Sequence, residues 1–96
     1  MGWNSMKGFA FTYVLKCSDG NWYIGSTPDL QRRLAQHQAG ASPNTRNRLP
    51  VELVCYEACR SLEAARSREK QLKTGFGRGY LKKRLGFEIP QTSPPS

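Results

Sequence analysis

Long hydrophobic runs and acidic residues are what this sequence lacks most clearly. Its apolar stretches stay well short of the roughly 18 residues that a membrane-spanning helix requires, and no apolar signal-peptide segment precedes residue 9. We therefore expect a cytoplasmic protein that does not enter a membrane. Only seven Asp and Glu residues oppose fifteen Lys and Arg residues, so the formal net charge is +8. This excess favours phosphate-rich partners, although an inert basic surface would carry the same charge.

Cysteine and histidine are also scarce. The three cysteines, Cys17, Cys55 and Cys59, form an odd set without a disulfide spacing, so we expect reduced and partly buried thiols. Cys55 and Cys59 together with His37, the one histidine, would supply three ligands, whereas a structural zinc site needs four. The cysteine pattern therefore gives little support to a zinc centre.

The chain length of 96 residues allows one small domain with one hydrophobic core. We expect a flexible N-terminus over residues 1–8, a folded domain over residues 9–85, and a disordered tail over residues 86–96 that ends in Pro and Ser. The sequence contains no internal repeat that would indicate a second unit.

The segment over residues 11–37 organises the predicted fold. Residues 11–17 and 22–25 are rich in β-branched and aromatic side chains, and the Asp-Gly pair between them indicates a β-hairpin. Both faces of the first run are apolar, which predicts a central strand covered by at least one helix. After this hairpin, Ser26 or Thr27 is expected to cap a helix that Pro28 starts.

Two polar residues lie on or beside the apolar stripe of that helix. His37 falls within the stripe, and Arg33 lies at its edge, one turn earlier. Arg33 is either a surface ion-pair partner of Asp29 or a functional group. His37 is either a buried helix-end histidine near Gly40, the expected C-cap, or part of a site.

The next segments are predicted from their composition. Residues 40–50 have the composition of a loop in which Arg46 and Arg48 are exposed. Residues 51–56 are expected to form a third strand, and Ser61 is expected to cap a second helix.

Glu69 conflicts with the pattern of that second helix. It lies centrally in an apolar stripe formed with Leu62, Ala65 and Leu72. A carboxylate on such a stripe is costly unless it is paired or bound to a cation. Glu69 is therefore either a functional acid or metal ligand, or a side chain that forms a salt bridge with Arg66 or reaches solvent.

A glycine-rich segment over residues 75–79 follows the second helix. It does not follow a strand, so it does not fit a dinucleotide-binding loop. We expect it to form a helix C-cap and a turn before a short basic helix over residues 80–85.

Several spaced motifs together resemble the GIY-YIG nuclease superfamily, in particular its small stand-alone YhbQ-like members and the Slx1-type nuclease domain. The strings are Thr-Tyr-Val at 12–14, Tyr-Ile-Gly at 23–25, the helix Arg and His at 33 and 37, and a later helix with a glutamate at 69. The first string differs from the Gly-Ile-Tyr of the family name, whereas the second string matches Tyr-Ile-Gly letter for letter. The resemblance covers roughly residues 9 to 85.

The resemblance implies an α+β fold in which helices flank a three-stranded antiparallel sheet whose strand order differs from chain order. It also implies phosphodiester hydrolysis that depends on one divalent ion, Mg²⁺ or Mn²⁺. Gly25 would let the backbone turn tightly beside the site.

The resemblance also implies roles for five residues. Glu69 would hold the metal, and Arg33 would stabilise negative charge on the phosphate. Tyr13 and Tyr23 would border the attacking water, and either of them can be the general base. His37 would orient a tyrosine or assist proton transfer.

These features predict a small metal-dependent DNA endonuclease that acts on structured or single-stranded DNA during repair or recombination. RNA cleavage stays open, as does the oligomeric state. The alternative is a non-catalytic or partner-dependent nucleic-acid-binding module with the same fold. The cations expected to contact nucleic acid are Arg32, Arg46, Arg48, Arg66, Lys70, Lys73 and Arg78.

Overall fold

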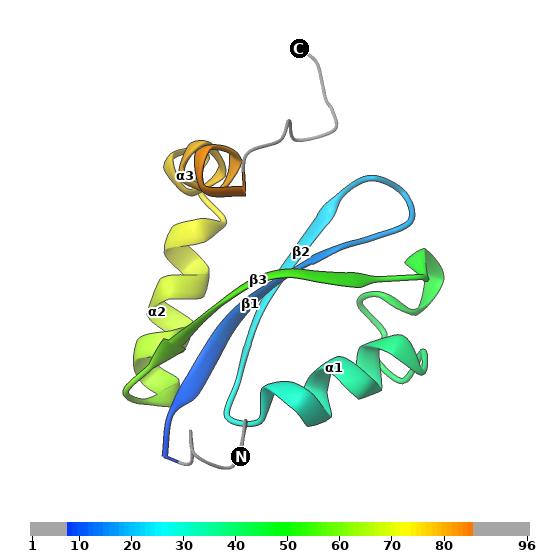
Figure 1. Ribbon diagram of the computed structural model, residues 1–96, viewed down its shortest axis with the longest axis horizontal. Coiled ribbons are helices and arrows are strands. Elements are labelled where there is room, and N and C mark those ends of the chain that lie inside the picture. Colours follow the sequence, from blue (N-terminus) through cyan, green and yellow to red (C-terminus); the bar gives the residue numbers. More distant parts are fainter. Residues whose placement is uncertain (1–7, 86–96) are drawn as a thin grey trace.

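The computed structural model describes residues 8–85. The expected tail over residues 86–96, and the expected flexible N-terminus except Gly8, lie outside the described residues. Within residues 8–85 no helix is long and apolar enough to cross a membrane. The elements, in chain order, are β1 (Ala10–Lys16), β2 (Trp22–Thr27), α1 (Leu30–Gln38), a single 3₁₀ turn (Arg46–Arg48), β3 (Glu52–Cys59), α2 (Leu62–Leu72) and α3 (Gly75–Leu85) (Figure 1).

The three strands form one antiparallel sheet in the order β2-β1-β3. The predicted α+β fold, with a strand order that differs from chain order, is therefore confirmed. β1 is the central strand and is buried from Ala10 to Leu15, as expected for a strand with two apolar faces. The hairpin turn contains Gly20 at a φ of 84°, a left-handed conformation that glycine adopts without strain.

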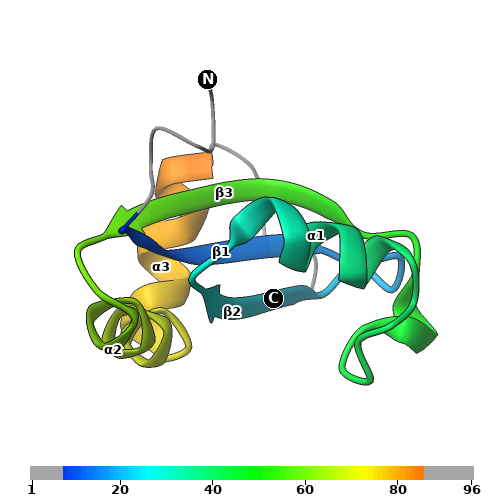
Figure 2. The same ribbon diagram turned by 90° about the horizontal axis from the view of Figure 1, so that it is seen from below.

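Helices cover both faces of the sheet (Figure 2). Because side chains alternate along β1, its apolar residues divide between two core clusters. The cluster beneath α1 comprises Phe11, Tyr13, Leu15, Cys17, Leu30 and Val51. The cluster beneath α2 and α3 comprises Val14, Ile24, Leu72 and Leu81.

The start of α1 differs from the prediction. Asp29, and neither Ser26 nor Thr27, is the N-cap, because its side chain accepts a hydrogen bond from the backbone N–H of Arg32. Ser26 and Thr27 stay in β2, where both residues pair with β1. Pro28 consequently lies before the helix and does not start it.

The glycine-rich segment is also helical, contrary to the predicted turn. α3 begins at Gly75, five residues before the expected helix over residues 80–85. The Thr74 hydroxyl accepts a hydrogen bond from the N–H of Gly77, as a capping side chain does. A Cβ on Gly77 would collide with the backbone of Leu72, so glycine at this position lets α3 approach α2 closely.

β3 is longer than predicted and extends past Tyr56 to Cys59. The added part carries Glu57, which accepts hydrogen bonds from Arg68 of α2 and Tyr80 of α3. These contacts join both helices to the third strand. The predicted cap at Ser61 is present, since its hydroxyl accepts a hydrogen bond from the N–H of Ala64.

Candidate active site

A buried chain of hydrogen bonds links β1 to α1 and to the loop that follows α1. The Tyr13 hydroxyl lies 2.9 Å from Nε2 of His37. The other ring nitrogen, Nδ1, lies 2.7 Å from the hydroxyl of Thr45. Tyr13 is 1% exposed, and His37 and Thr45 are fully buried. His37 is thus held at both ring nitrogens.

Burial keeps both members of the Tyr13–His37 pair neutral. Burial, together with the nearby charge of Arg33, lowers the pKa of His37 to about 4. It raises the pKa of Tyr13 to about 12, although Arg33 opposes this increase. A neutral imidazole has one acceptor and one donor nitrogen. We assign the acceptor to Nε2, which receives the Tyr13 proton, and the donor to Nδ1, which bonds Thr45.

Arg33 brings a positive charge to this cluster. Its interaction with the Tyr13 hydroxyl is the largest of the effects that raise its pKa, and Tyr23 contributes in the same direction. The guanidinium Nη1 donates to the side-chain oxygen of Gln36. Within residues 8–85 Arg33 forms no ion pair with a carboxylate, and the side chain of Asp29 is used as the cap of α1. Its charge is therefore available to an anion.

Tyr23 completes this side of the site. Its ring centroid lies 5.1 Å from that of His37 and 6.3 Å from that of Tyr13. Its hydroxyl accepts a hydrogen bond of 3.4 Å from the side-chain amide of Asn44. Tyr23 is half-buried, whereas Tyr13 is enclosed. Water therefore reaches Tyr23 more readily than Tyr13.

Gly25 provides the space that the Tyr13 hydroxyl occupies. The two residues are paired across β1 and β2, and a Cβ on Gly25 would lie 2.6 Å from that hydroxyl oxygen. The expected tight turn at this glycine is wrong, because Gly25 lies within β2. Glycine is required here for the close approach of a side chain.

Glu69 lies on the other face of the sheet. Its Oε1 accepts a hydrogen bond of 2.7 Å from the Ser26 hydroxyl, and its Oε2 forms an ion pair of 2.6 Å with Lys73. The carboxylate side chain is 22% exposed, so it is half-buried and paired. Lys73, and not Arg66 as considered from the sequence, is its ion-pair partner.

The carboxyl group of Glu69 is ionised at neutral pH. Burial acts to raise its pKa, but the hydrogen bonds from Lys73 and Ser26 and the charges of Lys73 and Arg66 outweigh burial, so the pKa is lowered. An anionic oxygen at the edge of the sheet is the donor type that Mg²⁺ and Mn²⁺ prefer. Within residues 8–85 no three His, Cys, Asp or Glu side chains form a metal-binding cluster. The donor set therefore fits an ion that keeps most of its water ligands.

One edge strand separates the two halves of the site. Consecutive residues of β2 face opposite sides, so Gly25 faces Tyr13 while Ser26 faces Glu69. The negative charge of Glu69 also acts to raise the pKa of Tyr13, although less strongly than burial does. A ligand that lies along the outer edge of β2 would meet both halves.

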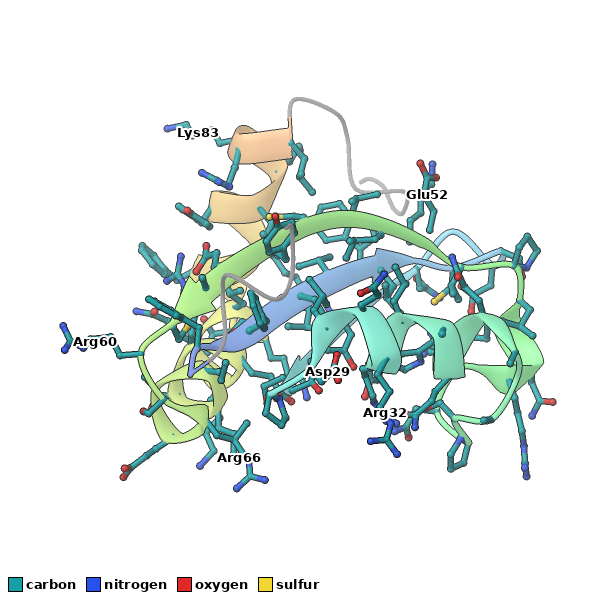
Figure 3. The ribbon with its side chains drawn as sticks, turned by 60° about the horizontal axis from the view of Figure 1, so that its bottom comes forward. Asp29, Arg32, Glu52, Arg60, Arg66 and Lys83 are labelled. Atoms are coloured by element: carbon teal, nitrogen blue, oxygen red, sulfur yellow. The ribbon has the colours of Figure 1, made fainter. Side chains whose placement is uncertain are left out.

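Most of the predicted nucleic-acid contacts are exposed side chains. Arg32 of α1 and Arg66 of α2 project from the same side of the molecule in Figure 3. Arg48 differs from the prediction, because it is half-buried, forms an ion pair of 3.6 Å with Asp19 and donates to the carbonyl of Asn44. The remaining predicted cations are exposed: Arg46, Lys70, Lys73 and Arg78.

Sequence reasoning did not identify Thr45, Asn44 and Ser26 as parts of the site. Thr45 and Asn44 lie in a loop whose composition carries no recognisable spacing, and only the fold brings them to His37 and Tyr23. Ser26 was interpreted as a helix cap. The side-chain alternation of a strand that continues through Ser26 would have placed it on the Glu69 face.

Comparison with known proteins identifies the class to which this fold and site belong. The family model of the GIY-YIG catalytic domain matches residues 9–84. The chain therefore belongs to the GIY-YIG family, a nuclease-type family whose substrates are nucleic acids.

Similar proteins include members of the group named UPF0213. A UPF0213 protein of Streptococcus pneumoniae is 49% identical over 65 residues, which are 67% of this chain and 66% of that protein. A UPF0213 protein of Haloquadratum walsbyi is 40% identical over 70 residues, which are 72% of this chain and 79% of that protein. The solution NMR structure of a UPF0213 protein from Bacillus halodurans is 34% identical and has a TM-score of 0.51. It covers 79% of this chain and 84% of that chain.

Proposed function

We propose that this protein is an endonuclease that hydrolyses phosphodiester bonds in single-stranded or structured DNA with Mg²⁺ or Mn²⁺, in repair or recombination in the cytoplasm. The observation that carries the proposal is the arrangement around two consecutive residues of β2. Gly25 adjoins the buried Tyr13, which is bonded to His37, and Ser26 adjoins the carboxylate of Glu69. Membership of a nuclease-type family supports the same function.

Arg33 would bind and stabilise the scissile phosphate. A guanidinium that lacks a carboxylate partner among the described residues can form paired hydrogen bonds with phosphate oxygens. Negative charge grows on those oxygens in the transition state, and a cation fixed beside them lowers the barrier. Its hydrogen bond to Gln36 helps to hold the guanidinium in place.

Tyr23 would border the attacking water, and Tyr13 would position the groups around it. Tyr13 is enclosed, has a pKa of about 12 and is bonded to His37, so its hydroxyl is poorly placed to receive a proton from water. Tyr23 is half-buried and lies against His37. We therefore propose Tyr23 as the general base.

Glu69 would hold the divalent ion. Bound there, the ion would supply Lewis-acid stabilisation of the phosphate and its leaving group. Lys73 now contacts Oε2 of Glu69, and its side chain is 53% exposed, so it can move away without unpacking the core. Ser26 would remain on Oε1 and keep the carboxylate oriented.

The Lys73–Glu69 ion pair also favours the alternative function. It neutralises the carboxylate without a metal ion, as expected if Glu69 only stabilises the fold of a non-catalytic or partner-dependent binding module. That alternative predicts DNA binding without cleavage.

Cleavage of labelled single-stranded, duplex and branched DNA, and of RNA, separates these functions. Wild type would be assayed with Mg²⁺ or Mn²⁺ and with EDTA, beside Glu69→Gln and Arg33→Ala. Glu63→Gln is the matched control, because Glu63 is an exposed glutamate on the same helix. We expect metal-dependent cleavage by wild type and the control, and loss of cleavage with retained DNA binding in Glu69→Gln. Binding without cleavage by wild type would favour the alternative, and cleavage that survives Glu69→Gln would exclude the proposed site.

A further inference from the structure

Phe76 is the most exposed large hydrophobic side chain among the described residues. It is 73% exposed, compared with 42% for Phe9 and for Tyr56. It lies in the first turn of α3, directly after the corner that joins α3 to α2. A phenylalanine in this position adds little to the core, so its ring is available to another molecule.

The residues around Phe76 leave its ring uncovered. Gly75 precedes it, and Gly79 lies three positions later, on the neighbouring surface of the helix. Glycine weakens a helix relative to alanine. A Cβ on either glycine would meet no atom within 4 Å, and neither residue has a positive φ, so neither packing nor backbone geometry requires glycine there. Gly77, by contrast, is required by its contact with Leu72.

Two exposed lysines flank the ring along the chain. Lys73 lies three residues before Phe76, at the end of α2, and Lys83 lies seven residues after it, which is the same side of α3 at 3.6 residues per turn. Lys83 is labelled on α3 in Figure 3. Lys73 also connects this corner to the candidate metal site through its ion pair with Glu69. A flat aromatic surface among cations suits a nucleotide, whose base stacks while its phosphate is attracted electrostatically.

We propose that Phe76 stacks against an unpaired nucleobase of the DNA strand bound at the Glu69 site. This inference rests on the proposed nuclease function and narrows its substrate to DNA with unpaired nucleotides. Bases within a duplex are already stacked on their neighbours and offer no free face, whereas bases in single strands, flaps and bulges do. Gly75 and Gly79 would give the base access to the ring.

The test measures DNA binding apart from cleavage. The Glu69→Gln protein would be titrated into a single strand, a flap and a blunt duplex, each containing 2-aminopurine. We expect Phe76→Ala in this background to bind the single strand and the flap about 10-fold more weakly, to bind the blunt duplex equally well, and to lose the quenching of 2-aminopurine. Phe76→Trp should restore binding. Phe9→Ala is the control, since it removes another exposed phenylalanine that lies outside the proposed site.

The outcomes distinguish failure of this inference from failure of the nuclease proposal. Unchanged single-strand binding by Phe76→Ala would overturn base stacking and leave the nuclease proposal standing. Equal weakening on single strand and duplex would also overturn stacking. Concentration-dependent self-association of the wild type that Phe76→Ala abolishes, with DNA binding unchanged, would assign the ring to a second copy of the chain. Absence of DNA binding and cleavage by wild type would overturn both proposals.

Discussion

The hydroxyl of Tyr13 occupies the space that a Cβ of Gly25 would need, at a distance of 2.6 Å. Tyr13 is enclosed and bonded to His37, so its ring cannot move aside without breaking that hydrogen bond. Glycine at position 25 therefore couples the packing of the hairpin to the geometry of the candidate site.

Replacing Gly25 by alanine should damage stability and activity together. We expect Gly25→Ala to lower the free energy of unfolding by about 1–3 kcal/mol, the usual cost of overpacking, and to reduce cleavage by displacing Tyr13. Urea denaturation and a cleavage assay measure the two effects. Gly79→Ala is the control for stability alone, because a Cβ at this position would meet open space. We expect this variant to gain about 0.5–1 kcal/mol of stability. A Gly25→Ala protein as stable and active as wild type would contradict the observed contact.

Removing Lys73 should strengthen metal binding at Glu69. The ammonium would compete with the proposed metal ion for Oε2. A solvent-accessible pair of this kind is weak, so Lys73→Gln should bind Mn²⁺ about two- to fivefold more tightly than wild type. Calorimetric titration with Mn²⁺ in the absence of DNA measures this affinity. Lys70→Gln removes the same charge from an exposed position on α2 and should change the affinity less. Equal affinities in both variants would show that Lys73 does not compete for the carboxylate.

Burial of His37 should make the stability of the protein depend on pH. Its pKa is about 4 in the folded protein, below the value of about 6.5 in an unfolded chain, so the unfolded state binds more protons between these values. The contribution is complete above about pH 6.5 and is lost as the pH falls toward about 4, by at most ~3 kcal/mol.

Urea denaturation between pH 4.5 and pH 8 would measure this dependence. His37 is the one histidine of the sequence, so His37→Gln should flatten the curve between pH 5 and pH 7. A wild-type curve that is already flat across that range would show that His37 is readily protonated in the folded protein.

Thr45 should act on cleavage through His37. Thr45→Val keeps the shape of the side chain but leaves Nδ1 of a buried imidazole unpaired, which should cost about 1–3 kcal/mol of stability. We expect slower cleavage with little change in DNA binding, and recovery in Thr45→Ser, which keeps the hydroxyl. Single-turnover cleavage and a binding titration measure these quantities. Failure of Thr45→Ser to recover would mean that packing by the methyl group, and not the hydrogen bond, supports His37.

Local sequence patterns predicted most of the fold. The Asp-Gly hairpin, the central position of β1 and the cap at Ser61 depend on short-range rules, and these were correct. The errors arose where tertiary contacts prevail. Pairing with β1 keeps Thr27 in a strand, and the close packing of Gly77 on Leu72 makes a glycine-rich segment helical.

The candidate site was only partly predictable. Motif spacing located Tyr13, His37 and Glu69, whose catalytic roles stay predictions. It did not reveal that Lys73 pairs with Glu69, because Arg66 lies three positions before Glu69 and Lys73 lies four positions after it, and helix spacing brings either cation within reach. The contact of Thr45 with His37 depends on how the loop after α1 folds back, which residue spacing does not determine.

Because Gly25 and Ser26 face opposite sides of the sheet, the candidate site depends on the register of β2 against β1. If β2 slid by one residue against β1, Ser26 would crowd Tyr13, and its hydroxyl would turn away from Glu69. Both halves of the candidate site, the Tyr13 side and the Glu69 side, would then be disrupted together. The length of the turn over residues 18–21 therefore helps to fix the register between β1 and β2, and with it the side of the sheet that each residue of β2 faces.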